Sequence, residues 1–249
     1  MKLAVSQIGE HSFRVSTCQN RKNTMSLLSF NKINRESVTQ QVYDSIKRRI
    51  IEGTLPPGTH LIETTIAEQM ATSRGPVREA LRLLEVEGLV EVRANVGTFV
   101  RSLPVKEIEE IYTVRSILEA YAAKLAAEKA NPQSIENLHR IKESVRQAAE
   151  RGDLKETVWL DFELHRQIWK IADHSILQDL LSHLEPRVRM FISLQAPLFE
   201  RLMDSIQDHQ AIVEAIENKE CEKASKLIQE HIILAGDLII RHMMEVRNE

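Results

Sequence analysis

Three arginines recur at four-residue intervals in one stretch of the chain, at Arg74, Arg78 and Arg82. On a helix, Arg74 and Arg78 lie about 40° apart, so both side chains point to one side, beside the apolar stripe that seats the helix. An arginine can bind O6 and N7 of guanine with two hydrogen bonds, or it can clamp a phosphate. The free amides of the first turn and the helix dipole also favour a phosphate there. Arg74 and Arg78 are therefore candidate DNA contacts.

Other interpretations of this arginine-bearing face exist. Arg82 is placed to reach the DNA backbone or to pair with Glu79 or Glu85, and the whole face could be a solvated surface with ion pairs inside the helix. Net charge does not distinguish DNA binding from a solvated surface. Residues 35–103 hold nine basic and nine acidic residues, whereas residues 1–34 hold five and one, and residues 104–249 hold 19 and 26. The choice between these interpretations therefore depends on the elements predicted around the arginines.

The segment before the arginines predicts two helices. Apolar residues at helical spacing indicate a first helix from residue 37 to a stop at Gly53, followed by turn residues at 55–58. The spacing Thr65-x-x-Glu68 predicts a capping box near the start of a short helix that ends around Met70.

The arginines open the next helix. Ser73 is its expected N-cap, and Gly88 is its expected stop. Two β-prone runs, 89–92 and 98–100, then predict a hairpin with Gly97 at its turn. Helix, turn, helix and hairpin in this order are typical of a winged helix-turn-helix, whose second helix lies in the DNA major groove. This order favours DNA binding over the solvated face.

Residues 37–101 also closely resemble the winged-helix domain of the GntR transcription regulators. The matching motifs are Leu55-x-Pro57-Gly58, Leu61-x-Glu63, Ser73-Arg74-Gly75-Pro76-Val77-Arg78-Glu79-Ala80-Leu81, Leu84-Glu85-x-x-Gly88-Leu89-Val90 and Gly97-Thr98-Phe99-Val100. The resemblance implies that Arg74 and Arg78 contact operator bases or phosphates, that Ser73 adds a phosphate contact, and that the wing turn approaches the minor groove. The implied DNA-binding set is Ser73, Arg74, Gly75, Arg78 and Gly97.

A second set of chemically capable residues lies in the C-terminal part, where polar side chains fall on apolar helix faces. Asp161 and His165 are one helical turn apart, and His209 and His231 lie on later helices. The expected apolar partners on these three faces are Val158, Phe162, Trp169 and Ala172, then Leu202, Ile206, Val213 and Ile216, then Ala224, Leu227, Leu234 and Leu238. Burying an unpaired imidazole or charge is costly. Three histidines and one carboxylate that converge would suit a divalent metal with open positions, zinc first, or nickel, manganese or iron.

Two alternatives to metal sensing remain open for this set. Asp161 and the three histidines could activate a metal-bound water, as in a metal-dependent hydrolase, although no general base is evident beside them. They could also form a metal-free internal polar network. A single histidine on an apolar face is more often a satisfied core residue than a ligand, and His139, His174 and His183 fall outside the apolar faces and are predicted to be at the surface.

The order Asp161, His165, His209, His231 resembles the metal-binding set of the FCD ligand-binding domain, the C-terminal partner of the winged helix in the FadR branch of GntR regulators. The resemblance implies a divalent cation at the centre of a helical bundle, with a small carboxylate effector that often completes its coordination. Arg115 falls on the apolar stripe Ile108, Ile111, Leu118 and Ala122. It would be the inward cation that meets the effector, although an exposed or ion-paired arginine is the equal alternative.

The expected architecture is mainly α, in three parts. Residues 1–33 are a flexible leader, residues 34–103 a winged helix-turn-helix, and residues 104–249 an all-helical domain of six to seven helices, with breaks near 131–132, 151–153, 173–174, 196–197 and 218. The length of 249 residues and the hydrophobic fraction of 43% suffice for two cores. Translation could start at Met1 or Met25.

Composition narrows the location. Cys18 and Cys221 are the only two cysteines, so no disulfide framework is predicted, and a reducing cytoplasm fits. No apolar run approaches the ~20 residues of a membrane span, and the first ten residues are too weakly apolar for a secretory signal. The expected function is a metabolite-responsive regulator, by family tendency a repressor and not an enzyme, that binds an inverted-repeat operator as a homodimer.

Overall fold

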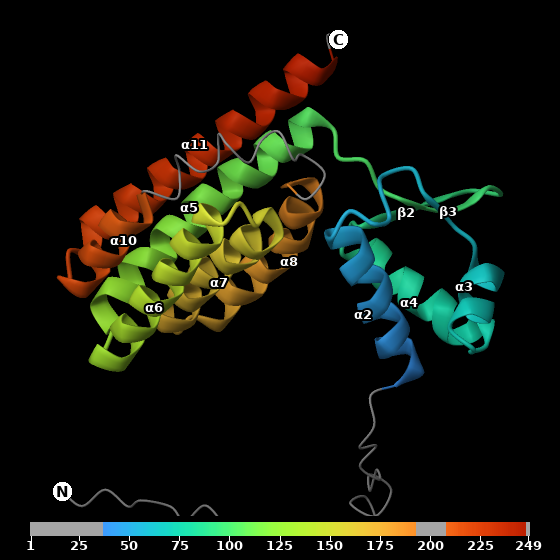
Figure 1. Cartoon of the computed structure of the whole chain (residues 1–249), viewed down its shortest axis with the longest axis horizontal. Helices are drawn as coiled ribbons and strands as arrows, with labels where there is room; N and C mark the ends of the chain where they lie inside the picture. The colour runs from blue at the N-terminus through green and yellow to red at the C-terminus, as the bar shows by residue number, and fades with distance from the viewer. Residues whose placement is uncertain (1–36, 193–207, 248–249) are drawn as a thin grey trace, which may run out of the picture. The chain divides into compact units, whose positions relative to one another are not determined.

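The computed structural model describes residues 37–192 and 208–247 (Figure 1). The predicted leader, Cys18, Met25 and the predicted break at 196–197 lie outside these residues, as do Leu202 and Ile206 of the predicted apolar face around His209. The described part is mainly helical, with one small sheet. It comprises a winged helix-turn-helix followed by an all-helical bundle, which confirms the predicted fold class.

The winged helix-turn-helix has three helices and a three-stranded sheet. The helices are α2 (Val38–Ile51), α3 (Glu63–Gln69) and α4 (Arg74–Val86). The strands are β1 (His60–Leu61), β2 (Val90–Arg93) and β3 (Gly97–Val100), antiparallel in the order β1-β3-β2. The hairpin of β2 and β3 pairs Glu91 with Phe99, and β1 pairs His60 with Phe99 from the other side. The hairpin is the expected wing, and β1 extends it.

Local chemistry explains the helix boundaries of this part. The Ser37 side chain caps α2 by accepting a hydrogen bond from the backbone N–H of Gln40. Gly88 follows α4 with a φ of 73°, a conformation that glycine adopts without strain. One prediction was wrong: α3 begins at Glu63 without a side-chain cap, so Thr65 and Glu68 form no capping box. The preceding strand β1 was not predicted, because two residues are too short to show a period.

The bundle contains six described helices. They are α5 (Val105–Lys129), α6 (Pro132–Glu150), α7 (Leu154–Ala172), α8 (Ser175–Ile192), α10 (Asp208–Glu217) and α11 (Cys221–Arg247). Asn131 forms a capping box with Ser134, Asp153 caps α7, and Asp173 ends it in a left-handed conformation. These caps account for the first three predicted breaks. None of the described helices is long and apolar enough to span a membrane.

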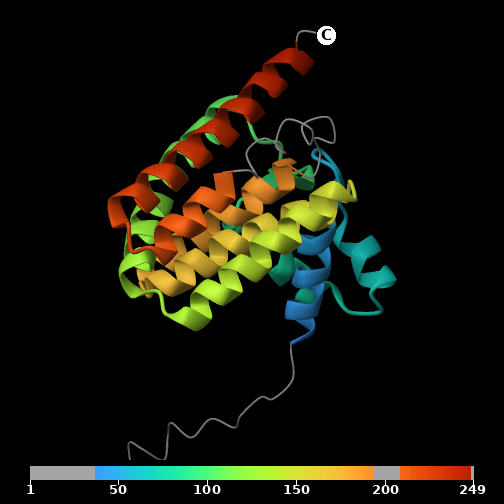
Figure 2. The same cartoon turned by 60° about the vertical axis from the view of Figure 1, so that its left-hand side comes forward.

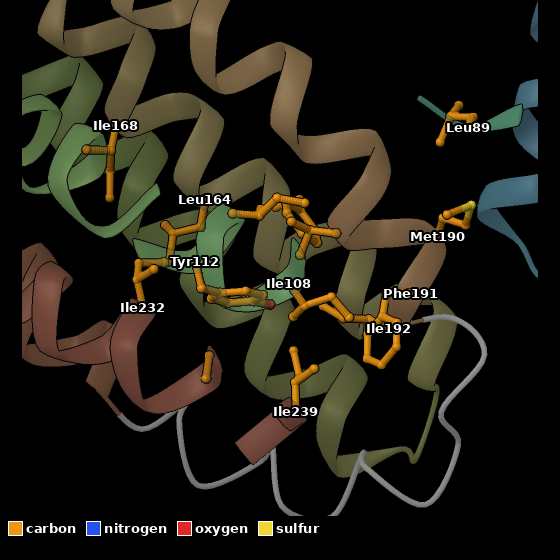
Figure 3. Packing of buried hydrophobic residues seen from close by; sticks show 14 of the residues in the cluster. Leu89, Ile108, Tyr112, Leu164, Ile168, Met190, Phe191, Ile192, Ile232 and Ile239 are labelled. Carbon is orange, nitrogen blue, oxygen red and sulfur yellow. The ribbon is translucent and has the colours of Figure 1, made fainter. Parts of the chain in front are cut away.

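The two longest helices, α5 and α11, lie side by side in both views (Figures 1 and 2). Gly236 permits this approach, since a Cβ there would lie 2.9 Å from the Tyr112 side chain. In Figure 3, Ile232 and Ile239 of α11 lie on the same core as Tyr112 of α5 and Leu164 of α7.

The apolar stripe of α11 differs in part from the prediction. Leu234 is 40% exposed, whereas Ile232 and Ala235 are buried with Ala224, Ile228 and Ile239. The sequence offers Ile232, Ile233 and Leu234 in succession, so the periodicity there does not select one face. The position of His231 is unaffected, because it borders both candidate faces.

Candidate DNA-binding face and metal centre

The start of α4 presents the predicted DNA-binding residues to solvent. Ser73 is the N-cap residue by its backbone, but its side chain makes no capping hydrogen bond. The side chains of Arg74 and Arg78 are 60% and 51% exposed, while Val77 and Ala80 on the opposite side are buried. Gly75 has open space where a side chain would stand. The helix is thus seated by its apolar face and offers the two guanidinium groups outward.

Glu63 at the start of α3 holds both arginines, a contact that the sequence reasoning missed. Arg78 donates from Nε to Oε1 at 3.1 Å and from Nη2 to Oε2 at 2.9 Å, and Arg74 donates to Oε2 at 3.3 Å. The hydrogen bonds from Arg78 lower the pKa of Glu63; burial opposes this, and the hydrogen bond from Arg74 adds to the lowering. Arg82 pairs instead with Glu79 at 3.2 Å, one of its two expected partners.

Gly97 was expected at the wing turn, but it is the first residue of β3, directly after the turn at 94–96, and it lies against His60. Gly97 has a φ of 135°, and a Cβ at this position would collide with His60 Nε2. The His60 ring stacks on Phe99 with centroids 4.5 Å apart, and the Arg93 guanidinium lies 4.4 Å from the centre of the same ring. One aromatic residue of β3 is therefore contacted from both neighbouring strands, which fixes the base of the wing.

The four predicted ligands come together in the bundle. Asp161 and His165 lie on α7, His209 on α10 and His231 on α11, and one ligand atom from each lies within 4.8 Å of all the others. His209 Nε2 is 3.1 Å from Asp161 Oδ1, and His165 Nε2 is 3.9 Å from the same oxygen. All three histidines are buried. Three imidazoles and one carboxylate at this spacing form a candidate centre for a divalent cation.

The free atoms of this cluster fit a metal. His165 Nε2, both ring nitrogens of His209 and His231 Nδ1 are buried without a hydrogen-bond partner in the described part of the chain. Buried imidazole nitrogens are normally satisfied, so unpartnered nitrogens from three histidines beside one carboxylate fit an ion held between them. The donor set is also chemically suited, since neutral imidazole and carboxylate bind zinc, nickel, manganese and iron.

The electrostatics favour the metal-binding protonation states. Burial lowers the pKa of His231 to about 4; the nearby Asp208 carboxylate opposes this, and the neighbouring histidines add to it. Burial disfavours ionisation of Asp161, but the close approach of His209 and the other two histidines outweighs it and holds the pKa of Asp161 well below its usual range. At neutral pH the cluster therefore offers an ionised carboxylate beside a neutral His231 imidazole.

Arg115 faces inward, as predicted, and it is paired with a buried carboxylate. It is 4% exposed, and its guanidinium lies 5.1 Å from the Phe162 ring centre and 5.6 Å from that of Tyr112. Its Nε donates to Glu119 Oε1 at 2.5 Å, while its Nη2 is buried without a hydrogen-bond partner in the described residues. The Nε–H of the guanidinium is thus committed to Glu119, and its Nη2 group is left for an anion.

Two acidic residues beside the centre were missed from the sequence. Glu119 is 0% exposed, and its Oε2 lies 2.5 Å from His165 Nδ1. Asp208 Oδ2 lies 3.9 Å from His231 Nδ1. For Glu119 a signal existed, because an acidic residue one turn after Arg115 on an alanine-rich buried stripe is out of place unless it is paired.

Comparisons with known proteins agree with this two-part layout. Residues 38–100 match the model of the bacterial regulatory proteins of the gntR family, and residues 110–234 match the FCD domain. The chain is 33% identical over 201 residues to a probable D-xylose utilization operon transcriptional repressor of Paenarthrobacter nicotinovorans, covering 81% of this chain and 88% of that protein. It is 30% identical over 193 residues to the gluconate operon transcriptional repressor of Bacillus subtilis, covering 76% and 79%. Among solved structures, E. coli McbR/YncC matches with a TM-score of 0.74 at 25% identity, covering 84% of this chain and 100% of that one.

Proposed function

Because the chain belongs to the gntR family of bacterial regulatory proteins and carries an FCD domain, we propose that this transcriptional regulator is a metal-containing, metabolite-responsive repressor. Family membership makes it a DNA-binding regulator rather than an enzyme, so the hydrolase alternative is set aside. The relatives named as operon repressors support repression. The proposal includes the division near residue 103 into a DNA head and an effector domain, both acting in the cytoplasm.

The observation that carries DNA recognition is the exposed pair Arg74 and Arg78 at the start of α4. Ser73, Gly75 and Gly97 complete the proposed contact surface. The Ser73 side chain makes no capping hydrogen bond, Gly75 leaves room for the backbone to approach, and Gly97 begins β3 directly after the wing turn. Base contacts by arginine in the major groove give specificity, and the helix N-terminus suits a phosphate.

Replacement of either arginine tests this proposal. We expect Arg74→Ala or Arg78→Ala to weaken binding to DNA selected by the wild-type protein from a random pool by about 10- to 100-fold. Arg82→Ala is the matched control, because its side chain pairs with Glu79 on the same helix. Gel shifts in which all three variants bind like the wild type would contradict the proposed contacts.

A homodimer would present two such heads to an inverted repeat. An exposed apolar stripe on the packed helices α5 and α8 supports a second copy as the partner. Its residues are Val114, Ile117, Tyr121, Ile176 and Leu180, each between 48% and 63% exposed. The underlying residues Leu177 and Leu181 of α8 belong to the same buried cluster as Ala122 of α5, so the exposed residues lie on two helices that pack together.

The dimer is tested by sedimentation. We expect Ile117→Glu to shift the protein toward a monomer and to weaken binding to the full operator. Ile233→Glu on α11, which also adds a charge at an exposed apolar position, is expected to leave the dimer intact. A wild-type protein that sediments as a monomer at micromolar concentration would remove the dimer from the proposal.

The proposed sensor is the Asp161, His165, His209 and His231 centre with Arg115. A divalent metal, zinc first, would be held by the four residues and would supply a Lewis-acidic binding point. Arg115 would bind the carboxylate of a small organic acid through its unpaired Nη2. Effector binding would shift the population of DNA-binding conformations. Mass analysis of any small acid that copurifies with the protein tests the class of effector.

A further inference from the structure

Glu119 occupies a position between the two proposed sensor groups. It is 0% exposed, and each of its oxygens is committed to a different partner. Oε1 accepts a hydrogen bond from Arg115 Nε at 2.5 Å, and Oε2 lies 2.5 Å from His165 Nδ1. Arg115 is one turn away on the same helix, whereas His165 comes from α7.

The contact with Glu119 determines which nitrogen of His165 is available. A carboxylate accepts hydrogen bonds, so Nδ1 must carry the proton and donate it. The lone pair of the neutral ring is then on Nε2, the nitrogen that is 3.9 Å from Asp161 Oδ1 and has no hydrogen-bond partner in the described residues. A ring turned by 180° would point the donor away from the carboxylate. The orientation of the imidazole and its tautomer are thus set together.

Arg115 supplies the countercharge that a buried carboxylate requires. The same carboxylate therefore holds the guanidinium by Nε and leaves Nη2 open. Glu119 restrains the two groups at once, one on the metal side and one on the effector side.

We propose that Glu119 is a positioning residue that fixes His165 as an Nε2 metal ligand and joins it to Arg115. This inference rests on the proposed metal centre. Carboxylates behind a ligating histidine fix its ring and raise its basicity, and their loss typically weakens metal binding 10- to 100-fold.

The test uses the full-length protein and a matched control. Glu119→Gln keeps the size of the side chain and removes its charge. Glu185→Gln makes the same change at another buried carboxylate, which pairs with Arg166 at 3.1 Å and Arg189 at 3.2 Å. Zn²⁺ affinity is measured by competition with a chelator, and Co²⁺ absorption spectra report the ligand geometry. We expect Glu119→Gln to lose 10- to 100-fold in Zn²⁺ affinity and to shift the Co²⁺ bands, and Glu185→Gln to match the wild type.

A second measurement needs no variant. Long-range ¹H–¹⁵N spectra of the wild-type protein, with and without Zn²⁺, should show His165 protonated at Nδ1. An Nε2-protonated His165, or equal affinity and equal spectra for wild type and Glu119→Gln, overturns the inference alone. A wild-type protein that binds no Zn²⁺ overturns the metal centre as well, so the two failures are distinguishable.

Discussion

Two arginine–carboxylate clusters, one in each half of the described chain, contrast in burial. Glu63 is bound by Arg74 and Arg78, whose side chains are 60% and 51% exposed. Glu119 is bound by Arg115, and both are buried. An exposed arginine can exchange its carboxylate for a DNA phosphate at small cost, because water screens both states. A buried pair loses far more when one partner is removed. An arginine–carboxylate pair can thus exchange its partner in the winged helix-turn-helix, whereas the pair in the bundle holds a fixed geometry.

Removal of each carboxylate should separate the two clusters most strongly. We expect Glu119→Ala to lower the free energy of unfolding by about 3–5 kcal/mol, because Arg115 would be left as an unpaired buried charge. Glu63→Ala is expected to leave it nearly unchanged, since exposed ion pairs contribute little. Urea unfolding of the two variants beside the wild type measures both. Equal destabilisation would erase the distinction between the clusters.

A bound metal should stabilise the folded protein through the buried histidine cluster. With free Zn²⁺ at 100 times its dissociation constant, we expect the free energy of unfolding to rise by about 2.7 kcal/mol. His209→Ala and His231→Ala should lose this gain, because each removes one of the four proposed ligands. Thermal unfolding with Zn²⁺ and with a chelator checks it, and His183→Ala, a surface histidine on α8, is the control. A gain that persists in both ligand variants would place the metal elsewhere.

Acid should also act through the buried cluster. The folded protein holds the pKa of His231 at about 4, whereas an unfolded histidine titrates near its ordinary value of about 6.5. Between about pH 6.5 and 4, His231 binds a proton in the unfolded chain but not in the folded protein. The metal-free protein therefore loses stability as pH falls from about 6.5 toward 4. One such proton lowers the free energy of unfolding by about 1 kcal/mol for each pH unit of acidification. Urea unfolding at pH 7, 6 and 5 measures the slope, and His231→Leu should flatten it.

The smallest effect is expected at the exposed cluster. Glu63→Gln removes the charge that competes with DNA for Arg74 and Arg78 and leaves their guanidinium groups less ordered. Binding to unrelated DNA should tighten, and the ratio of specific to non-specific affinity should fall roughly two- to fivefold. Glu79→Gln, which frees only Arg82, is the matched control. Unchanged discrimination in Glu63→Gln would show that the carboxylate does not orient the arginines.

Sequence patterns predicted features whose cause is local. Ser73, Gly88 and the outward arginines follow from helix termini and periodicity, and the three histidines and Asp161 stood out as polar residues on apolar faces. Glu119 did not, because its meaning depends on His165, 46 residues away in sequence. Glu63 likewise needs the fold, since its partners lie on the next helix. Pairings across elements are set by packing, which periodicity does not encode.

Gly236 offers no functional group, yet we expect it to affect the proposed metal centre. The Tyr112 side chain occupies the space that a Cβ would need, so the spacing between α11 and α5 depends on the missing methyl group. His231 stands on α11 five residues earlier, and Glu119 stands on α5. An alanine at position 236 would push these helices apart and enlarge the opening between the imidazole of one helix and the groups behind the other. We expect the size of the ion that the site prefers, and with it the choice among zinc, nickel and manganese, to depend on the residue at position 236.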